Sequence, residues 1–144
     1  MELNQTKTGV HTTVINATNN IVNNETNVVI NGGKLFAVNS IATGDYGSVV
    51  VNEKKKTNLD DENQVASTEL STTESHALYS YWGNLEVNGG TIETRDTTAV
   101  TGHHAITVTG GTIKGTRGIK NEMWCTWSMC GYEPITVTGG TMIG

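Results

Sequence analysis

The stretch Ile106-Thr107-Val108-Thr109-Gly110-Gly111-Thr112-Ile113 decides the fold, because the chain repeats it with small changes. Close variants occupy residues 28–35, 85–92 and 135–142, and all four units share the order apolar, any, apolar, Asn or Thr, Gly, Gly, any, apolar. Alternating apolar residues predict a strand with one buried face. The Gly pair permits a bend in which φ turns positive or another backbone comes close. A strand, a corner and a second strand, repeated at a fixed period, predict one coil of a solenoid.

The distance between units predicts a coil of about 21 residues, a period typical of a solenoid repeat. The same interval separates Leu85 from Ile106, the first apolar residues of two units, and separates Val28 from Val49, where a decayed unit begins. The steps from Val49 to Leu85 and from Ile106 to Ile135 are longer than this interval. They exceed it by about 15 and about 8 residues, which are lengths that an inserted loop can have. Two loop insertions into a regular repeat explain both long steps.

These distances predict an all-β fold, a single-stranded parallel β-helix (β-solenoid) of about five coils in residues 28–144. We expect it to be right-handed, as parallel crossovers usually are. The insertions are placed near residues 53–70 and 122–131. Residues 1–27 are predicted to form an irregular N-terminal cap, because the unit-like segment 15–22 begins too close to Val28 to leave room for a full coil. Such a cap would cover the open end of the strand column.

The composition fits a narrow solenoid and argues against several partners. Only 35% of the residues are hydrophobic, but a narrow coil needs few inward apolar residues, so disorder does not follow from this value. The formal net charge of −5 and the lack of a basic stripe argue against nucleic acid as a partner. No apolar run reaches the length of a membrane span, so we expect no membrane insertion, and no signal peptide opens this chain.

Cys125 and Cys130 are the only cysteines, and they lie close together in the second insertion. An isolated pair at this distance favours a local disulfide in an oxidising compartment, and therefore an extracellular or cell-surface location. A zinc site would need two further ligands, for which His103 and His104 are the nearest candidates. We favour the disulfide and predict no metal site and no cofactor.

Equivalent positions of successive coils stack directly in a parallel solenoid, so aligned columns of residues are informative. One column follows the second apolar residue of each unit and is rich in Asn. Stacked amide side chains can hydrogen-bond along such a column, as they do in cross-β stacks. We therefore predict a structural ladder formed by Asn31, Asn52, Asn88, Thr109 and Thr138.

A second column, just before each unit, consists of aromatic and imidazole rings. Such rings can stack on one another and seal a corner of the coil, or they can form a platform on which flat sugar faces lie. Exposed Trp on a rigid support is costly unless it is used, so a Trp-rich loop tied by a disulfide favours binding. The predicted platform comprises Tyr46, Trp82, His103 and Tyr132, with Tyr79, Tyr81, Trp124 and Trp127 near it.

No motif in the chain indicates catalysis. Glycoside hydrolysis needs two carboxyl groups about 5–10 Å apart, and the acidic residues of the repeat fall in different columns. His103 and His104 beside Asp96 could supply a base, but adjacent strand residues point to opposite faces, so at most one could act. The sequence contains no nucleophile elbow, phosphate loop or metal motif. We predict that the protein is not an enzyme.

The phrases Leu85-Glu86-Val87-Asn88-Gly89-Gly90-Thr91-Ile92 and Ile135-Thr136-Val137-Thr138-Gly139-Gly140-Thr141 resemble a known family. They are similar to bacterial cell-surface parallel β-helix proteins with Gly-Gly-Thr repeats, a group that includes carbohydrate-binding and adhesin-like solenoids. The resemblance covers roughly residues 28–144 and implies the fold more specifically than the function. Members that bind calcium carry acidic residues just before a Gly-Ile step. Here Thr116-Arg117 precede Gly118-Ile119, so the resemblance does not imply a calcium site.

These observations predict a non-catalytic, extracellular surface module that binds carbohydrate or another host or surface ligand, as an adhesin does. The alternative is a structural filament or stalk subunit that assembles end to end through an open end of the solenoid. The repeat supports this alternative because its last unit stops at Gly144, inside an expected second strand, and unpaired strand edges propagate.

Overall fold

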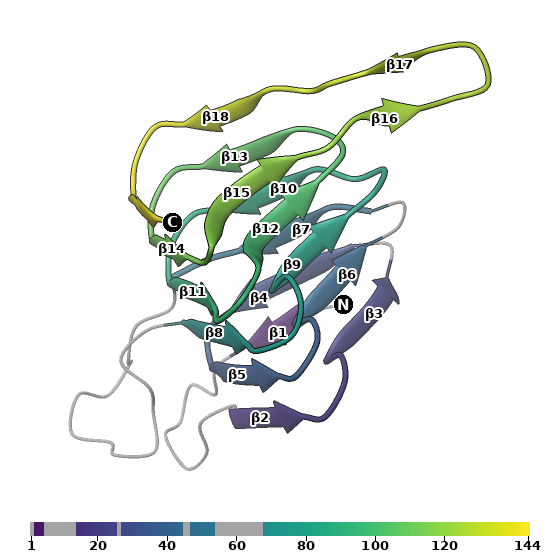
Figure 1. Ribbon diagram of the computed structural model, residues 1–144. Helices are drawn as coiled ribbons and strands as arrows, with labels where there is room; N and C mark the ends of the chain where they lie inside the picture. Colours follow the sequence, from purple (N-terminus) through teal and green to yellow (C-terminus); the bar gives the residue numbers. More distant parts are fainter. Residues whose placement is uncertain (1, 5–13, 26, 45–46, 54–67) are drawn as a thin grey trace.

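The computed structural model describes residues 2–4, 14–25, 27–44, 47–53 and 68–144 (Figure 1). These residues form strands and their connecting turns, and no helix occurs among them. Nearly all strands belong to three sheets, which the chain enters in turn, so that each strand pairs with the equivalent strand of the next repeat (Figure 1). The fold is all-β with parallel strands in stacked sheets, which is compatible with the predicted β-solenoid.

The three sheets and one hairpin account for every strand in the described part of the chain. Sheet A consists of β1 (Glu2–Asn4), β4 (Val28–Asn31), β7 (Val49–Val51), β10 (Leu85–Val87), β13 (Ile106–Val108) and β18 (Ile135–Val137). Sheet B consists of β2 (Val14–Ala17), β5 (Lys34–Ala37), β8 (Glu69–Thr72), β11 (Thr91–Thr94), β14 (Thr112–Lys114) and β19 (Thr141–Ile143). Sheet C consists of β3 (Val22–Glu25), β6 (Ala42–Gly44), β9 (Leu78–Ser80), β12 (Thr98–Gly102) and β15 (Arg117–Asn121). β16 (Trp124–Cys125) and β17 (Cys130–Gly131) form a separate antiparallel pair.

The first apolar residues of the five units lie in one line across sheet A. Val28 is in register with Val49, Val49 with Leu85, Leu85 with Ile106, and Ile106 with Ile135. All pairings between these strands are parallel. The two long steps, from Val49 to Leu85 and from Ile106 to Ile135, therefore end in the same register as the regular steps.

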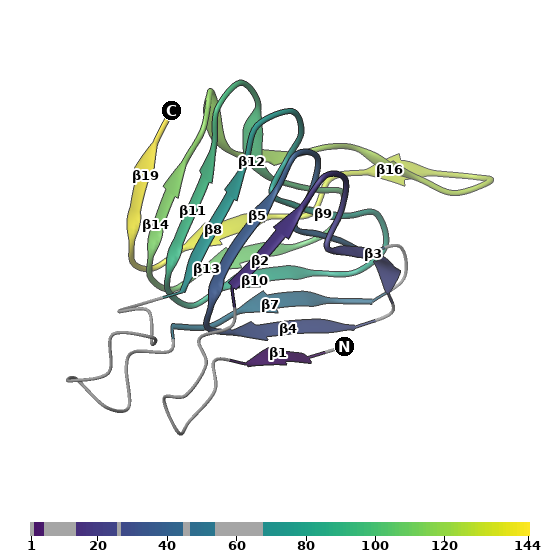
Figure 2. The ribbon, with the colours of Figure 1, turned by 90° about the horizontal axis from the view of Figure 1, so that it is seen from below.

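The core is the space between the three sheets (Figure 2), and strands such as β4, β7, β10 and β11 contribute alternate residues to it. In sheet A the first and third residues of β10, Leu85 and Val87, are fully buried, while Glu86 between them reaches the surface. This is the burial pattern expected of a half-buried strand. The other large buried side chains are aliphatic too; among them are Ile30, Leu35, Leu70, Leu78, Ile92 and Ile113.

The glycine pair of each unit turns the chain from sheet A to sheet B. Its second glycine has a positive φ in four units, with values of 96° at Gly33, 84° at Gly90, 91° at Gly111 and 90° at Gly140. Residues with a Cβ rarely adopt this conformation. The corner is also crowded, since a Cβ on Gly111 would lie 2.6 Å from the carbonyl oxygen of Gly90. Stacked corners therefore require glycine for conformation and for space.

The described parts of residues 2–25 are strands, which corrects the expectation of an irregular cap in residues 1–27. β1 pairs with β4, β2 with β5 and β3 with β6, all in parallel. Ile15 is in register with Leu35 of sheet B and not with Val28 of sheet A, so the unit-like segment 15–22 does not begin a sheet A strand. Asn19 lies at the next turn instead, where its Oδ1 accepts a hydrogen bond from Asn39 Nδ2 at 2.6 Å. Sheet A therefore holds six strands, one more than the five units indicate.

Both insertions fall where the long steps of the repeat place them. The chain leaves sheet A after Val51 and enters sheet B at Glu69, and residues 54–67 lie outside the described part. The predicted range of 53–70 runs slightly too far, because Leu70 is a core residue of β8 with 1% of its surface exposed. The second insertion, predicted at 122–131, contains the hairpin of β16 and β17.

Replacing Gly111 with Ala should lower the free energy of unfolding by about 1–3 kcal/mol, because Ala disfavours the positive φ and its Cβ approaches the backbone of the stacked corner. Urea denaturation followed by circular dichroism measures the change. Gly118→Ala is the matched control, since a Cβ there meets Met142 Cβ at an ordinary 3.6 Å. Equal losses in the two variants would contradict the role of the corner.

Candidate functional site

A disulfide-tied hairpin projects from the edge of the column between sheets C and A (Figures 1 and 2). We use "the hairpin" for residues 122–134, which connect β15 to β18. Cys125 and Cys130 are directly opposite each other on its two strands and form the predicted disulfide, with a Cα–Cα distance of 4.1 Å. The amide of Thr126 donates to the carbonyl of Met129 at 2.8 Å and closes the turn. The two short strands are thus held together at their ends by covalent and hydrogen bonds.

The hairpin exposes large apolar side chains that a surface loop would ordinarily not carry together. Trp127 is fully exposed, with 106% of its reference area accessible to solvent. Met123, Met129 and Tyr132 are also exposed. Contiguous exposed apolar side chains of this kind mark binding surfaces. Aromatic residues and Met are the types enriched at such surfaces.

Trp124 joins the hairpin to the column through a stack of rings. It is parallel to His104, with ring centroids 5.7 Å apart and an interplanar angle of 13°. His104 in turn lies against Trp82 at 5.6 Å. On its other side Trp124 packs on Gly131, where a Cβ would approach Trp124 Cζ2 to 2.9 Å. The ladder Trp82–His104–Trp124 is therefore continuous from the turn after β9 to the hairpin.

The predicted column placed Trp82 above His103, but in the structure Trp82 lies against His104, one residue further along the chain. Ser80 of β9 is in register with Gly102 of β12, so Tyr81 lies beside His103 and Trp82 beside His104. The ring centroids of Tyr81 and His103 are 4.2 Å apart. The cause is the connection to sheet A, which is one residue longer after β9 than after β12. Counting backward from the units therefore placed the rings in the wrong register, and His104 was missed as a ladder ring.

The exposed face of the ladder borders a hollow of about 560 Å³, which we call the hairpin hollow. It is lined by Trp82, Cys125, Thr126 and Trp127, so its walls come from the column and from the hairpin. Its surface is mainly apolar, with Thr126 supplying a hydroxyl group. A flat ligand with one apolar face could lie against the indole rings here, since aromatic faces favour offset stacking.

His103 is buried, with 8% of its surface exposed, and it contacts the first leg of the hairpin. Its Nδ1 lies 2.9 Å from the carbonyl oxygen of Met123, which can only accept, so Nδ1 carries the proton. Its Nε2 lies 3.1 Å from Tyr79 Oη and 3.3 Å from Glu122 Oε2. The imidazole is enclosed by Tyr79, Met123 and Glu122, so the arrangement fixes the first leg of the hairpin to the column.

His104 contacts both legs of the hairpin. Its ring stacks on Trp124 of the first leg, and its Nδ1 lies 3.7 Å from Glu133 Oε1 of the returning leg. Asn121 Nδ2, just before the hairpin, donates to the backbone carbonyl of His104 at 2.8 Å. The adjacent histidines therefore meet residues at both ends of residues 122–134.

Of the remaining predicted platform residues, Tyr79 and Tyr81 join the rings around His103, with centroids 5.8 Å and 4.2 Å from its ring. Tyr46 lies outside the described residues. Tyr79 stacks on His76 with centroids 5.2 Å apart, and Tyr81 packs edge-on against Trp82 at 4.8 Å. Tyr132 is exposed and borders neither the ladder nor the hairpin hollow. Of the eight predicted residues, Trp82 and Trp127 line the hairpin hollow, and Trp124 supports the hairpin through its stack on His104.

The predicted polar ladder lies on the opposite edge, at the corner between sheets A and B. Asn52 Nδ2 donates to Asn31 Oδ1 at 2.8 Å, and Asn88 Nδ2 donates to Asn52 Oδ1 at 2.9 Å. Thr109 Oγ1 continues the ladder with a bond of 2.6 Å to Asn88 Oδ1. Thr138 is in line through its backbone, whose amide donates to Val108. These side chains bond to one another along the stack, which is a structural role.

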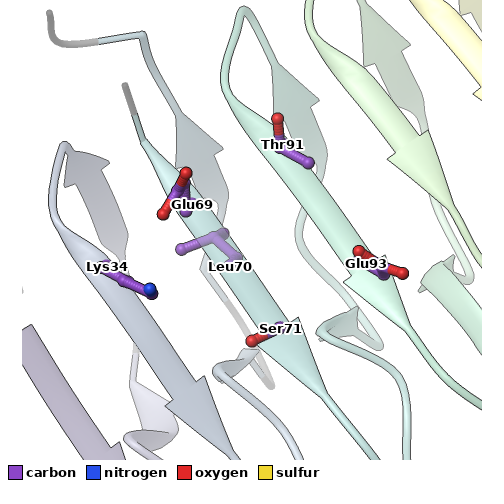
Figure 3. Close-up of a pocket in the computed structure, with 6 residues that line it drawn as sticks. All are labelled: Lys34, Glu69, Leu70, Ser71, Thr91 and Glu93. Atoms are coloured by element: carbon purple, nitrogen blue, oxygen red, sulfur yellow. The ribbon is translucent and has the colours of Figure 1, made fainter. Parts of the chain in front are cut away.

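A second, smaller hollow of about 180 Å³ lies on the outer face of sheet B (Figure 3). Its rim is formed by Lys34 of β5, Glu69 and Ser71 of β8, and Thr91 and Glu93 of β11, with Leu70 at its base (Figure 3). Glu93 also forms an ion pair with Lys114 at 3.5 Å. The hollow has no aromatic wall, so it offers no stacking surface. It is a gap between outward side chains of a flat sheet.

The described residues contain no group of three or more His, Cys, Asp or Glu side chains placed to hold a metal ion. Nor do they include a helix long and apolar enough to cross a membrane. A scan against protein-family models and searches of curated proteins and of solved structures returned no significant match. The resemblance to cell-surface β-helix proteins remains a prediction from the repeated phrases.

His76 is half-buried beside Tyr79, and its titration makes the stability of the fold depend on pH. Burial lowers the pKa of His76, although Glu122 opposes the shift, and Lys120 adds to it. The unfolded chain therefore binds this proton more readily than the folded chain, so stability should fall as the pH drops below about 6.5. The pKa of Glu122 is lowered too, chiefly by the hydrogen bond from Lys120. The stability that Glu122 contributes is therefore fully present above the ordinary pKa of Glu and is lost as the pH falls below it.

The variant His76→Gln should flatten the loss of stability between pH 7.5 and pH 5.5, because glutamine cannot become charged. Urea denaturation at intervals across this range gives the slope of the unfolding free energy against pH. The slope is compared and not the level, since Gln also removes the ring that stacks on Tyr79. Parallel slopes for variant and wild type would show that His76 does not carry the effect.

Proposed function

We propose that this protein is a non-catalytic, extracellular surface module that binds carbohydrate through its hairpin, as adhesin-like proteins do. One observation carries the proposal: Trp127 is fully exposed on a disulfide-tied hairpin and shares the hairpin hollow with Trp82. Two indole rings fixed at one hollow offer apolar faces to the flat face of a pyranose ring. The hydroxyl of Thr126 donates to the carbonyl of Met129 at 3.3 Å, and its oxygen can accept a hydrogen bond from a sugar hydroxyl.

Rigidity of the support favours binding over a loose surface loop. The disulfide joins the two hairpin strands, and Trp124 fixes the hairpin to the column by stacking on His104. A ligand then meets side chains that are already in place, so little conformational entropy is lost on binding. The disulfide also suits an oxidising, extracellular environment.

We propose further that the chain winds as a right-handed β-solenoid, with one strand from each sheet in a full turn. The regular steps of the repeat and the parallel register of the marker column support this interpretation. The strands β1, β2 and β3 add a turn before the five predicted from the units. A column of this kind is a stiff support that presents its hairpin at one edge.

Trp127→Ala and Trp82→Ala should each weaken binding to an oligosaccharide by about tenfold or more, because truncating a central aromatic residue commonly costs at least about 1.4 kcal/mol. A glycan array with the wild type identifies the oligosaccharide, and isothermal titration calorimetry then measures the affinities. Trp127 has no buried contact to lose, so its variant should unfold at the wild-type temperature.

Tyr132→Ala is the matched control, since Tyr132 is an exposed aromatic residue of the hairpin outside the hairpin hollow. Its affinity should stay within about twofold of the wild type, as expected for a residue outside the binding hot spot. The proposed function would be overturned if the wild type bound no glycan. It would also be overturned if both Trp variants bound the oligosaccharide with the affinity of the wild type.

A second candidate is end-to-end assembly as a filament or stalk subunit, which the outer edges of β18 and β19 favour. Core positions that are buried in the preceding strands are open there. Ile106 and Ile113 are 0% exposed, whereas Ile135 and Met142, in register with them, are 42% and 41% exposed. In this candidate, another copy of the chain covers these side chains and pairs with the outer edges of β18 and β19.

This second candidate predicts that the protein forms larger species as its concentration rises. Val137→Lys should reduce their formation, because Val137 is in the core column of sheet A and a charge there would oppose stacking. Thr136→Lys, on the outward position of the same strand, should leave it unchanged. Light scattering after size-exclusion chromatography measures the mass. A monomer at every concentration would remove this candidate.

A further inference from the structure

The two adjacent histidines after β12 make more contacts with the hairpin than a structural corner requires. His103 meets the first leg at Glu122 and Met123, and His104 meets the returning leg at Glu133. Both side chains are largely covered, with 10% and 18% of their side-chain areas exposed. They cannot offer a ring face to a large ligand from these positions. Any effect on ligand binding would have to pass through the hairpin.

We infer that His103 and His104 are positioning residues whose charge determines how firmly the hairpin is held against the column. Each faces a carboxylate on a different leg, at 3.3 Å for His103 Nε2 and Glu122 Oε2, and at 3.7 Å for His104 Nδ1 and Glu133 Oε1. The inference rests on the proposed function where it concerns ligand binding. The mechanical part, how firmly the hairpin is held, stands on the contacts alone.

The neutral state of His103 follows from its hydrogen bonds. Nδ1–H donates to the carbonyl of Met123, so the unprotonated Nε2 accepts from the hydroxyl of Tyr79 at 3.1 Å. Glu122 then faces a lone pair and is not attracted to the ring. Protonation places a second N–H on Nε2, which can donate to Glu122 Oε2 while Nδ1 keeps its bond to Met123. The first leg is then held by a backbone hydrogen bond and an ion pair.

Protonation of His104 acts on the returning leg in the same direction. The imidazolium would attract Glu133, and the charge would also favour its stack between Trp82 and Trp124, since cations are drawn to indole faces. At the base of the hairpin His104 Nε2, Asn121 Oδ1 and Trp124 Nε1 are buried without a hydrogen bond among the described residues. Buried polar atoms without partners are costly, and in the imidazolium the Nε2–H of His104 is one of them, so the attraction to Glu133 and to the indole faces acts against this cost.

Other charged groups near the two histidines set the limits of this effect. Lys120 Nζ bonds to Glu122 Oε1 at 2.9 Å and shares that carboxylate with His103. The pKa of Glu122 is lowered, first by this bond, so Glu122 remains a carboxylate while imidazoles titrate. His76 also interacts with Glu122, but burial lowers its pKa, so His76 charges later than an exposed imidazole as the pH falls. Tyr81 lies against the face of His103, with ring centroids 4.2 Å apart.

The sign of the effect follows directly. Each proton that His103 or His104 gains between pH 7.5 and pH 5.5 adds attraction to a carboxylate on the hairpin. The hairpin should therefore be held more firmly at pH 5.5 than at pH 7.5. This is opposite to the effect of His76 on the stability of the whole domain, so local and global measurements can be told apart.

Hydrogen exchange of the full chain at pH 5.5 and pH 7.5 tests the inference. The protection factors of amides in residues 123–131, corrected for the intrinsic pH dependence of exchange, should be about threefold or more higher at pH 5.5. Amides of β11 serve as the internal reference and should not follow the same change. Equal protection of the hairpin at the two pH values in the wild type would overturn the inference.

The double variant Glu122→Gln, Glu133→Gln isolates the two carboxylates. It keeps the size and polarity of both side chains, so its hairpin should fold but lose the difference between the two pH values. Each single variant should lose part of the difference. Glu93→Gln is the matched control, because it removes a surface carboxylate paired with Lys114 on sheet B, and it should retain the difference in full. An undiminished difference in the double variant would also overturn the inference.

Binding of the oligosaccharide found on the array is then measured at both pH values. If the proposed function and this inference both hold, the affinity of the wild type should rise at pH 5.5 and that of the double variant should not. A pH-dependent hairpin in a protein that binds no glycan would refute only the proposed function. Glycan binding with a hairpin that is equally protected at the two pH values would refute only the histidine inference.

Discussion

The structure depends on in-register stacking of identical backbone shapes. Each strand of a sheet pairs with its equivalent one repeat away, so the inward apolar positions stack in line, as Leu85 does on Ile106, Ile92 on Ile113 and Val100 on Ile119. An apolar residue then stacks on an apolar residue, and an amide bonds to an amide. The Gly-Gly corner is the part of the repeat that tolerates least change. Its positive φ and its close approach to the next corner both exclude a Cβ.

This constraint also explains where the chain can vary. A loop can be inserted at a turn if the strands on either side return to their register. The insertion after Val51 and the hairpin after Asn121 both do so, since Leu85 still pairs with Val49 and Ile135 with Ile106. The turns between sheets C and A carry the ring residues and the hairpin. The irregular parts of the chain therefore lie at one edge of a regular column. Loops on a rigid support are where binding sites commonly occur.

The group of stacked rings beside the hairpin is formed by neighbouring turns. Tyr81 and Trp82 come from one turn, His103 and His104 from the next, and Trp124 from the hairpin that follows. The rings stack because the turns do. The two histidines, in the middle of this group, are covered by the rings on both sides and by the hairpin. Their position makes them supports of the hairpin and separates them from the exposed indole of Trp127.

The amino-acid sequence by itself determined the sheet A strands of the five repeated units, the glycine corners, the line of apolar residues in sheet A, the Asn ladder and the disulfide. These features repeat along the chain, and a repeat of constant length fixes which side chains must be neighbours. The tertiary structure alone decided the register of the rings, because one additional residue in the turn after Ser80 moves Tyr81 beside His103 and leaves Trp82 beside His104. It also decided that β1 to β3 join the sheets and that the hairpin folds back onto His103 and His104. Those contacts depend on turn lengths and side-chain packing, which no periodic pattern in the sequence specifies.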